Sequence, residues 1–225
     1  MAWVIGDIHG CLEELQELLF QLPSEDRLIF LGDYVDRGPD SAGVVDRLLK
    51  ERNRSIFLKG NHESMMIAHF LNPASSEGSS WTYGPNGGLK TLQSYGLGVR
   101  SSWEELPFSH REFLQNLKLY FEDSAFIAVH AGLDPGVSDL SSQSVHDLLW
   151  IRLEWINREE FWKGSPVYYG HTPTQYILGP DRMGEPLYGK NSIGIDTGCV
   201  YGGSLSAINT ESGQLIQVTA KKAYS

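Results

Sequence analysis

Three short apolar segments near the start of the chain each lead into a glycine that is followed by an aspartate or an asparagine: Ala2–Ile5 before Gly6-Asp7, Leu28–Leu31 before Gly32-Asp33, and Ser55–Leu58 before Gly60-Asn61. Segments with leucines and valines at helical spacing separate and follow them, over residues 12–22, 41–50 and 63–71. This order predicts an α/β fold with a parallel or mixed sheet covered by helices. Ligands of such sheets bind beyond the carboxyl ends of the strands, where these polar residues lie.

The rest of the chain continues this pattern after a less regular stretch. Residues 72–120 are rich in Ser, Gly, Pro and aromatic residues, with short helices expected over Leu89–Tyr95 and His110–Leu117. We expect a small helical cap inserted into a single domain of residues 1–225, because this stretch has too few apolar positions for a core of its own. Five more strands are expected, the last two joined by a hairpin: Ala125–Val129, Pro166–Tyr169, Ser192–Ile195, Ser204–Ile208 and Leu215–Val218.

Composition narrows the class of protein. The chain has 225 residues, of which 41% are hydrophobic and 20% charged, so it is not a disordered chain. No apolar run approaches the roughly 20 residues of a membrane helix, and the first residues show no signal peptide. A net charge of −10 argues against general nucleic-acid binding. The two cysteines, Cys11 and Cys199, form no disulfide framework, and we expect reduced thiols in a cytoplasmic protein.

Five expected strand ends carry side chains that can bind metal ions: Gly6-Asp7-Ile8-His9-Gly10, Gly32-Asp33-Tyr34-Val35-Asp36-Arg37-Gly38, Gly60-Asn61-His62-Glu63, Val129-His130-Ala131-Gly132 and Tyr169-Gly170-His171-Thr172-Pro173. Carboxylate oxygens together with imidazole nitrogens suit Mn, Fe or Zn. The supply of ligands exceeds what one ion needs, so two are expected, and such a pair roughly 3.5–4 Å apart can act on a phosphoryl group. One motif alone is more often an ordinary turn, but five at successive strand ends favour a metal site.

These motifs, in this order, resemble those of the phosphoprotein phosphatase (PPP) branch of the calcineurin-like metallophosphoesterases, and most closely the short bacterial and phage Ser/Thr-type phosphatases. The resemblance runs from Asp7 to His171. It implies two mixed β-sheets packed as a sandwich and flanked by helices (α/β/β/α), with the strands after Ser192 in the second sheet. It also implies a phosphoric monoester hydrolase that depends on two divalent metal ions, with Mn²⁺ expected first and Fe or Zn as alternatives.

The resemblance assigns a role to each motif residue. Asp7 and His9 would bind the first metal ion, Asp33 would bridge both ions, and the second would be completed by Asn61, His130 and His171. His62 would be the general acid that protonates the leaving alkoxide, and Asp36 would hold its other ring nitrogen. Arg37 and Asn61 would contact the substrate phosphate.

A second phosphate-binding arginine is expected further along the chain. Arg152 follows Leu148-Leu149-Trp150-Ile151, which resembles the segment before that arginine in the family. Arg158 is the alternative, and an exposed arginine paired with Glu154 or Glu159 is the plain structural interpretation. The implied reaction is a single-step hydrolysis, in which a metal-bridging hydroxide attacks phosphorus in line while both arginines stabilise the phosphoryl oxygens. Cys11 is assigned to packing, because no arginine-rich loop of a cysteine phosphatase is present.

Three other features are less specific. The segment Gly184–Asn191 nearly matches a phosphate-binding loop, but it ends in Asn and precedes the apolar strand, so we expect a hairpin. The stretch Trp81–Tyr95 contains Asn86-Gly87-Gly88, which resembles a stretch in bacterial relatives; it either lines the substrate site or packs a satellite cluster. Tyr201, in the loop Gly198–Gly203, would overhang the metals, as family members have a residue there.

Several functions are open on the sequence alone. The first is hydrolysis of phosphomonoesters, with phosphoserine or phosphothreonine in proteins as substrate and small phosphate esters or phosphotyrosine also open. The second is symmetrical hydrolysis of diadenosine tetraphosphate; Asp36-Arg37 favours the first, because that branch commonly departs from this pair. The third is a non-catalytic scaffold for phosphorylated proteins, which would have lost a metal ligand or His62, whereas every expected position is filled. No nucleic-acid or membrane partner is expected, and the sequence does not determine the oligomeric state.

Overall fold

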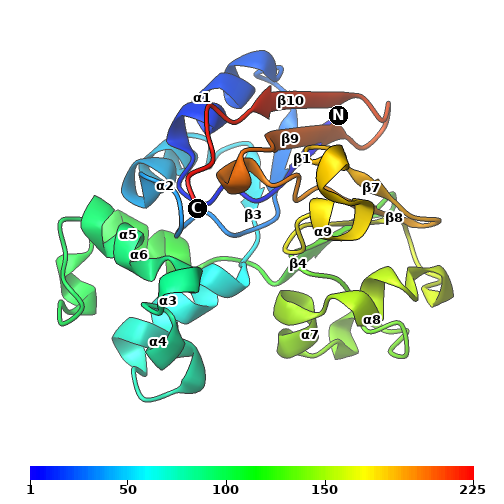
Figure 1. Ribbon diagram of the computed structural model, residues 1–225. Coiled ribbons are helices and arrows are strands. Elements are labelled where there is room, and N and C mark those ends of the chain that lie inside the picture. Colours follow the sequence, from blue (N-terminus) through cyan, green and yellow to red (C-terminus); the bar gives the residue numbers. More distant parts are fainter.

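The computed structural model describes residues 1–225 as two five-stranded mixed sheets packed against each other, with helices on the outer faces (Figure 1). The first sheet has the order β10 (Leu215–Thr219), β9 (Ser204–Asn209), β1 (Ala2–Ile5), β2 (Arg27–Phe30) and β3 (Ser55–Phe57). The second has the order β4 (Tyr120–Glu122), β5 (Ile127–Val129), β6 (Val167–Tyr169), β8 (Ser192–Gly194) and β7 (Leu187–Tyr188). The predicted α/β/β/α sandwich is confirmed.

The longer helices, such as α1 and α2, lie where apolar residues recur at helical spacing, and most of the others are short. They are α1 (Leu12–Gln21), α2 (Ser41–Lys50), α3 (Asn61–Leu71), α4 (Ser76–Ser80), α5 (Gly88–Ser94), α6 (Phe108–Gln115), α7 (Val145–Trp150), α8 (Leu153–Ile156) and α9 (Gln175–Leu178). The predicted limits of α2 are confirmed, and Asp40 caps it by accepting a hydrogen bond from the backbone N–H of Gly43. No helix of the structure has the length and apolar character needed to cross a membrane.

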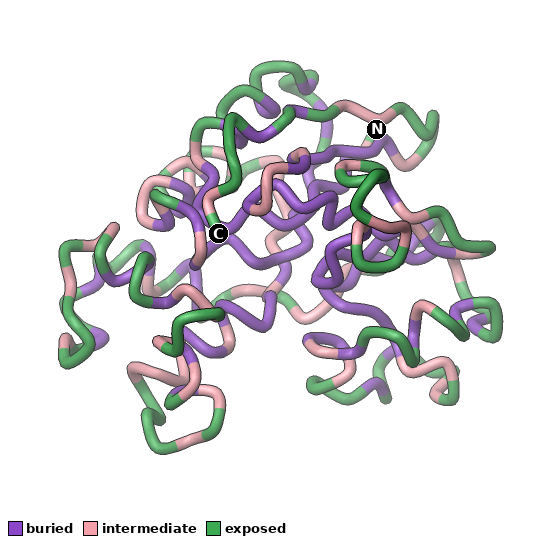
Figure 2. The backbone as a smooth tube through the Cα atoms, in the orientation of Figure 1, coloured by how far each residue is buried: buried purple, intermediate pink, exposed green.

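Three apolar layers hold the sandwich together. Between the sheets, Val4 and Ile29 of the first pack with Phe126 and Tyr168 of the second. The outer face of the first sheet packs against α1 and α2, and the outer face of the second packs against α7 and α8. Fully burying one such aliphatic or aromatic side chain contributes roughly 1.5–3 kcal/mol. Figure 2 shows the result: the strands in the centre are buried, and the exposed residues lie on the outer helices and loops.

The last two strands do not lie where the family resemblance placed them. Of the strands from Ser192 on, only β8 joins the second sheet, whereas β9 pairs antiparallel with β1 and β10 pairs with β9 in the first sheet. The expectation of a second-sheet position is therefore wrong for both. Residues Leu205–Asn209 are buried, so β9 satisfies the backbone groups along the open side of β1 and buries its own side chains there. The predicted hairpin between β9 and β10 is confirmed.

Several elements of the second half were not predicted. Strand β4 has three residues and lies at an edge, and β7 has only two, so neither shows an alternating pattern long enough to recognise. Helices α7 and α8 are equally short; α7 begins because the Ser144 hydroxyl accepts a hydrogen bond from the backbone N–H of Asp147. The hairpin expected at Gly184–Asn191 is present, since β7 pairs antiparallel with β8.

The segment predicted as a cap, residues 72–120, contains α4, α5 and α6. Helix α4 packs on α3, and α5 and α6 pack on α2. Its large side chains, including Trp81, Leu92, Trp103 and Phe113, belong to the same apolar cluster as those of α1 and α2. The segment therefore extends the helical layer on the first sheet. The limits of the cap within a single domain stay a prediction.

Candidate metal centre

Six strand ends meet at one edge of the sandwich. Strands β1, β2 and β3 are parallel to one another, and so are β5, β6 and β8, so their carboxyl ends point the same way within each sheet. The first sheet supplies Asp7, Asp33 and Asn61, and the second supplies His130, His171 and Asp196. Asp196 was not among the site residues expected from the sequence. It follows Ile193-Gly194-Ile195, so the same signal of an apolar run before an acidic residue was available.

Glycines allow the two sheets to approach closely at this edge. A Cβ atom at Gly170 would overlap the carboxylate of Asp7 from the other sheet. A Cβ atom at Gly60 would overlap both the carboxylate and the backbone nitrogen of Asp33. Only glycine fits at these two positions, because any other residue would push a candidate ligand away.

The backbone of the site is unusually strained. The non-glycine residues with a positive φ angle in this protein, which range from 48° to 74°, are all candidate site residues: His9, Asp33, Asp36, Arg37 and His171. Such left-handed conformations are uncommon for residues with a side chain and cluster at functional sites. The folded protein thus holds these residues in an unfavourable backbone conformation, and this conformation directs their side chains into the site.

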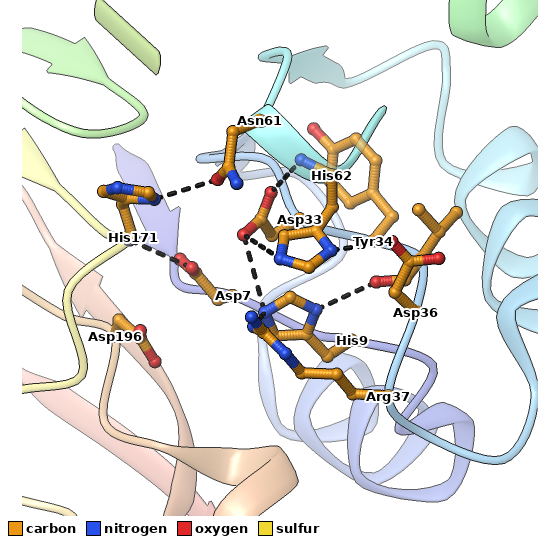
Figure 3. A network of polar contacts seen from close by, with 12 residues as sticks. Asp7, His9, Asp33, Tyr34, Asp36, Arg37, Asn61, His62, His171 and Asp196 are labelled. Atoms are coloured by element: carbon orange, nitrogen blue, oxygen red, sulfur yellow. Dashed lines mark hydrogen bonds and ion pairs between the residues drawn. The ribbon is translucent and has the colours of Figure 1, made fainter. Parts of the chain in front are cut away.

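The first group of candidate ligands contains His9 and Asp33. His9 Nδ1 lies 2.9 Å from the carbonyl oxygen of Val35, so this nitrogen donates a hydrogen bond and Nε2 retains its lone pair. Nε2 lies 3.5 Å from Asp33 Oδ2 and 2.7 Å from Nη1 of Arg37 (Figure 3). A positively charged guanidinium thus occupies the position from which a metal ion would bind His9.

The second group lies on the other side of Asp33. His130 Nδ1 donates to the carbonyl oxygen of Leu31 at 3.0 Å, so the lone pair of Nε2 faces Asn61 Oδ1 at 3.0 Å and Asp33 Oδ1 at 3.5 Å. His171 Nδ1 lies 2.9 Å from the same Asn61 oxygen. The acceptors His130 Nε2, Asn61 Oδ1 and Asp33 Oδ1 thus face one another, and they repel unless a cation lies between them. Asp33 offers one oxygen to each group, as expected of a bridging ligand.

Asp7 joins the sheets at the centre of the site. Its Oδ2 accepts the backbone N–H of His171 at 2.9 Å, whereas its Oδ1 is buried and has no hydrogen-bond partner. The ring Nε2 of His171 is also buried without a partner. His9, Asp33 and His62 form one compact group of possible metal ligands. Asp7 lies at the site but is not a member of this group. Unpartnered buried oxygens of this kind fit a metal ion.

Buried carboxylates make the site electrostatically unfavourable without cations. Burial, followed by the charges of Asp196 and Asp33, raises the pKa of Asp7 well above its ordinary range. Burial also raises the pKa of Asp196 to about 6. Burial acts in the opposite direction on the histidines and lowers the pKa of His9, His130 and His171, so neutral rings with free lone pairs are favoured. The donor set therefore fits two divalent metal ions.

Glu63 supports the loop that carries Asp33, a role that the sequence analysis did not assign. Its carboxylate accepts the backbone N–H groups of Asp33 and Gly60 at 2.9 Å and of Tyr34 at 2.8 Å. Burial raises the pKa of Glu63 to about 8. The signal was present, because a glutamate two residues after Asn61 lies in the first turn of α3 and can reach back to the residue that caps the helix.

His62 and Asp36 form the expected pair. His62 Nδ1 lies 2.6 Å from Asp36 Oδ2, and both side chains are buried. Asp36 also accepts the indole N–H of Trp81 at 2.8 Å and the hydroxyl of Thr91 at 2.6 Å. His62 Nε2 lies 3.9 Å from Asp33 Oδ2, so the free edge of the ring faces the candidate metal ligands. The Trp81–Tyr95 stretch therefore holds Asp36 from behind, in addition to packing in the core.

The two predicted phosphate-binding arginines lie beside the ligands. Arg37 contacts His9 as described above, and Arg152 Nη1 donates to the carbonyl oxygen of His171 at 3.0 Å and to the Thr172 hydroxyl at 3.1 Å. The alternative, Arg158, instead lies over the ring of Phe161 on the outer surface. The geometry thus favours Arg152 over Arg158. Cys11 and Cys199 are buried and unbridged, as expected of packing residues.

Comparison with known proteins shows the family to which the chain belongs. The family model described as calcineurin-like phosphoesterase matches residues 2–202. The chain therefore belongs to the calcineurin-like phosphoesterases, and the resemblance seen in the sequence is confirmed. It is a metallophosphoesterase, of a family that uses divalent metal ions.

Individual relatives give a more detailed comparison. The chain is 27% identical to bis(5′-nucleosyl)-tetraphosphatase PrpE [asymmetrical] of Anoxybacillus flavithermus, over 98% of this chain and 95% of that protein. It is 28% identical to the protein of the same name from a Geobacillus species, with the same two coverages. A solved structure proposed to be a diadenosine tetraphosphatase matches with a TM-score of 0.69 at 25% identity, over 97% of this chain and 93% of that one. A serine/threonine phosphatase from Saccharomyces cerevisiae shares the fold, with a TM-score of 0.61 at 18% identity, over 97% and 79% of the two chains.

Proposed function

We propose that this metallophosphoesterase is a hydrolase of dinucleoside polyphosphates that acts through two metal ions. The observation that carries the proposal is the pair of ligand groups that share Asp33, one with His9 and the other with Asn61, His130 and His171. The choice of a dinucleotide substrate is supported by the names of the relatives that match nearly the whole chain. Those relatives are named asymmetrical tetraphosphatases, whereas the alternative considered from the sequence was the symmetrical reaction.

Each side chain has a definite task in this proposal. Asp7, His9, Asp33, Asn61, His130 and His171 hold the metal ions. When bound, the two ions would activate water and neutralise charge on the phosphoryl group under attack. Arg37, beside His9, and Arg152, beside His171, would bind the phosphoryl oxygens and stabilise the negative charge that develops on them. Asn61, whose Oδ1 lies between His130 and His171, would also contact the substrate phosphate.

Hydrolysis of phosphomonoesters, including phosphoserine and phosphothreonine in proteins, is the second candidate. It is favoured by the buried pair of His62 and Asp36, which is directed at the metal ligands. Protonation of the leaving oxygen matters most when that oxygen would leave as an alkoxide, as it does from serine. A nucleotide phosphate is a much better leaving group, so this pair is worth more to a protein phosphatase than to a dinucleotide hydrolase.

Mn²⁺ is the metal ion that we propose for both reactions. The ligands combine carboxylate and amide oxygens with imidazole nitrogens, and no thiolate lies among them. This mixture suits Mn and Fe, and also Zn, better than it suits Mg or Ca. Metal-free protein reconstituted separately with Mn²⁺, Zn²⁺ and Fe²⁺ is expected to be most active with Mn²⁺; higher activity with another ion would assign that ion instead.

A single comparison of substrates tests the proposal. Purified protein with Mn²⁺ is assayed against diadenosine tetraphosphate, a phosphoserine peptide and a phosphotyrosine peptide, with products separated by chromatography. Faster turnover of the dinucleotide, measured as kcat/KM, supports the proposal, and the products then report the position of cleavage: ATP with AMP, or two molecules of ADP. Faster turnover of either peptide contradicts it and supports the second candidate. An Asp33→Asn variant, which lacks the shared carboxylate, should lose activity on every substrate.

A further inference from the structure

Two tyrosines lie together near the metal centre, on short helical segments that follow two of the site strands. Tyr201 ends the short helical turn Cys199–Tyr201 after Asp196, and Tyr176 lies in α9, five residues after His171. Their ring centres are 6.5 Å apart, with the planes inclined by 53°. Tyr176 is 64% exposed, so its ring is not part of any core.

Arg37 connects these rings to the candidate ligands. Its Cζ atom lies 5.8 Å from the centre of the Tyr201 ring, and its Nη1 lies 2.7 Å from His9 Nε2. A cation over an aromatic face is attracted to it, which keeps Tyr201 beside the guanidinium. A phosphate held by Arg37 therefore lies next to Tyr201, and Tyr176 is one ring further from the metal ligands.

This order of groups matches the chemistry of a nucleotide. A nucleoside polyphosphate carries its anionic chain at one end and a flat aromatic base at the other. Bases stack readily on exposed tyrosine rings, and such stacking accepts any base because every base has a π-face. A phosphorylated serine or threonine has no ring at a fixed distance from its phosphate, so it gains nothing from these tyrosines.

We propose that Tyr176 and Tyr201 form a stacking site for a nucleobase of the substrate, next to the phosphate position at Arg37. The inference rests on the proposed function and adds to it the part of the protein that recognises the nucleoside. It assigns Tyr176 as a binding residue that distinguishes nucleotides from other phosphate compounds. Stacking is non-specific among bases, so adenine and guanine nucleotides should both benefit.

The test compares two ligands that differ only in the nucleoside. The dissociation constants of ATP and of inorganic tripolyphosphate are measured by calorimetry on protein loaded with excess Mn²⁺. In Tyr176→Ala the affinity for ATP should fall about five- to tenfold, at the low end of the range for loss of one stacking ring. The affinity for tripolyphosphate should stay within twofold of wild type, which also shows that the variant is folded. Tyr176→Phe should retain ATP binding, because stacking needs the ring and not the hydroxyl.

A matched control is Tyr188→Ala, since Tyr188 is 60% exposed but lies on the edge strand β7. It should leave both constants unchanged. An equal loss of affinity for both ligands in Tyr176→Ala, or no loss for either, would overturn the stacking site, and so would a wild-type protein that does not bind ATP.

The two proposals fail in different ways. If the dinucleotide is not hydrolysed but ATP binding depends on Tyr176, the proposed reaction is wrong and the stacking site stands. If the dinucleotide is hydrolysed with the same KM by wild type and Tyr176→Ala, the stacking site is wrong and the reaction stands.

Discussion

At the scale of single residues, the site is defined by which ring nitrogen each histidine leaves free. The carbonyl oxygens of Val35 and Leu31 take the Nδ1 hydrogens of His9 and His130, so both rings turn their Nε2 lone pairs toward Asp33. His62 is oriented differently, because the carboxylate of Asp36 holds its Nδ1. The first two rings are therefore prepared to bind a cation, and the third to carry a proton.

This difference predicts how His62→Asn behaves. Turnover of a phosphoserine peptide should fall about 10²- to 10⁴-fold, the usual contribution of a general acid. Hydrolysis of diadenosine tetraphosphate should fall much less, because its leaving group needs little protonation. Metal content, measured by elemental analysis, should stay near wild type. His69→Asn, in the same helix α3 but hydrogen-bonded to Gly78, is the matched control. Unchanged turnover of the peptide in His62→Asn would remove the acid assignment.

At the scale of elements, the first turn of α3 is the part of the fold on which most of the site depends. Asn61 and His62 open this helix, and Glu63 in the same turn binds the backbone of the Asp33 loop. Gly60 lies between the helix and that loop with no space for a side chain. Helix α3 and strand β2 are thus joined at the point where the shared ligand is held.

Gly60→Ala should therefore disturb the metal site more than the fold. The new methyl group would displace Asp33, so the affinity for Mn²⁺, measured by calorimetry, should fall by at least tenfold. Gly98→Ala is the control, because a Cβ atom there meets nothing within 4 Å. Wild-type affinity in Gly60→Ala would show that the loop can move aside, and would contradict this account.

A second feature at this scale is the ion pair network at the end of α2. Glu51 accepts hydrogen bonds from Arg47 at 2.6 Å and from Arg54 at 2.7 Å, and Arg54 also donates to the carbonyl oxygen of Pro23. Partial burial alone would raise the pKa of Glu51, but the two arginines outweigh it and lower the pKa below its ordinary value of 4.5. The stabilisation is then fully present above pH 4.5 and is lost as the pH falls through the lowered pKa.

Glu51→Gln should accordingly lower the Tm more at pH 7 than at pH 3. The pair is partly exposed, so we expect a loss of about 0.5–1 kcal/mol at pH 7, or roughly 1–4 °C for a chain of this size. Thermal unfolding followed by circular dichroism at both pH values measures the difference. Glu17→Gln, an exposed acid on α1 without an ion pair, should change little at either pH. An equal effect of Glu51→Gln at both pH values would show that packing, not charge, is responsible.

The same elements show how far the sequence determines the structure. Apolar runs and helical spacing were sufficient to predict β1, α2 and the order of the elements in the first half, because β1 is almost fully buried and α2 is long. The position of β9 against β1 was not predictable, since its buried pattern fits either sheet and only the assembled fold decides. Asp196 was not predicted, although an apolar run precedes it as one precedes the other site residues. The hydrogen bond from Trp81 to Asp36 was not predictable, because these residues are far apart in the sequence and meet only in the folded protein. A contact between two elements leaves no recognisable pattern in the sequence of either element.

At the scale of the whole molecule, the acidic composition and the affinity for phosphate are compatible. The net charge of −10 includes four carboxylates buried near one another, those of Asp7, Asp33, Glu63 and Asp196. Two divalent ions would more than offset the two carboxylates expected to bind them, and Arg37 and Arg152 add positive charge at the same edge. The net charge of the whole chain thus does not give the charge of the site, which would be locally positive once loaded.

Removal of the metal ions should therefore lower the stability of the folded protein without unfolding it. Metal at 100 times its dissociation constant stabilises the folded state by about 2.7 kcal/mol per site, so chelation should lower the Tm by roughly 5–10 °C for one such site. Far-ultraviolet circular dichroism at 25 °C should not change, because the three apolar layers are independent of the ions. Readdition of Mn²⁺ should restore the Tm. Loss of secondary structure on chelation would mean that the ions are needed for folding.

The contact between Arg37 and His9 has a consequence for the order in which ligands bind. The guanidinium donates to the same Nε2 atom that a metal ion would use, at 2.7 Å. A metal ion that binds His9 must displace Arg37, whose other contacts are the carbonyl oxygen of Pro85 and the ring of Tyr201. The displaced guanidinium can then bind phosphate. In the metal-free protein, its hydrogen bond to His9 competes with phosphate binding. Metal and substrate should thus bind in a compulsory sequence, with the metal first, and phosphate compounds should bind the metal-free protein only weakly.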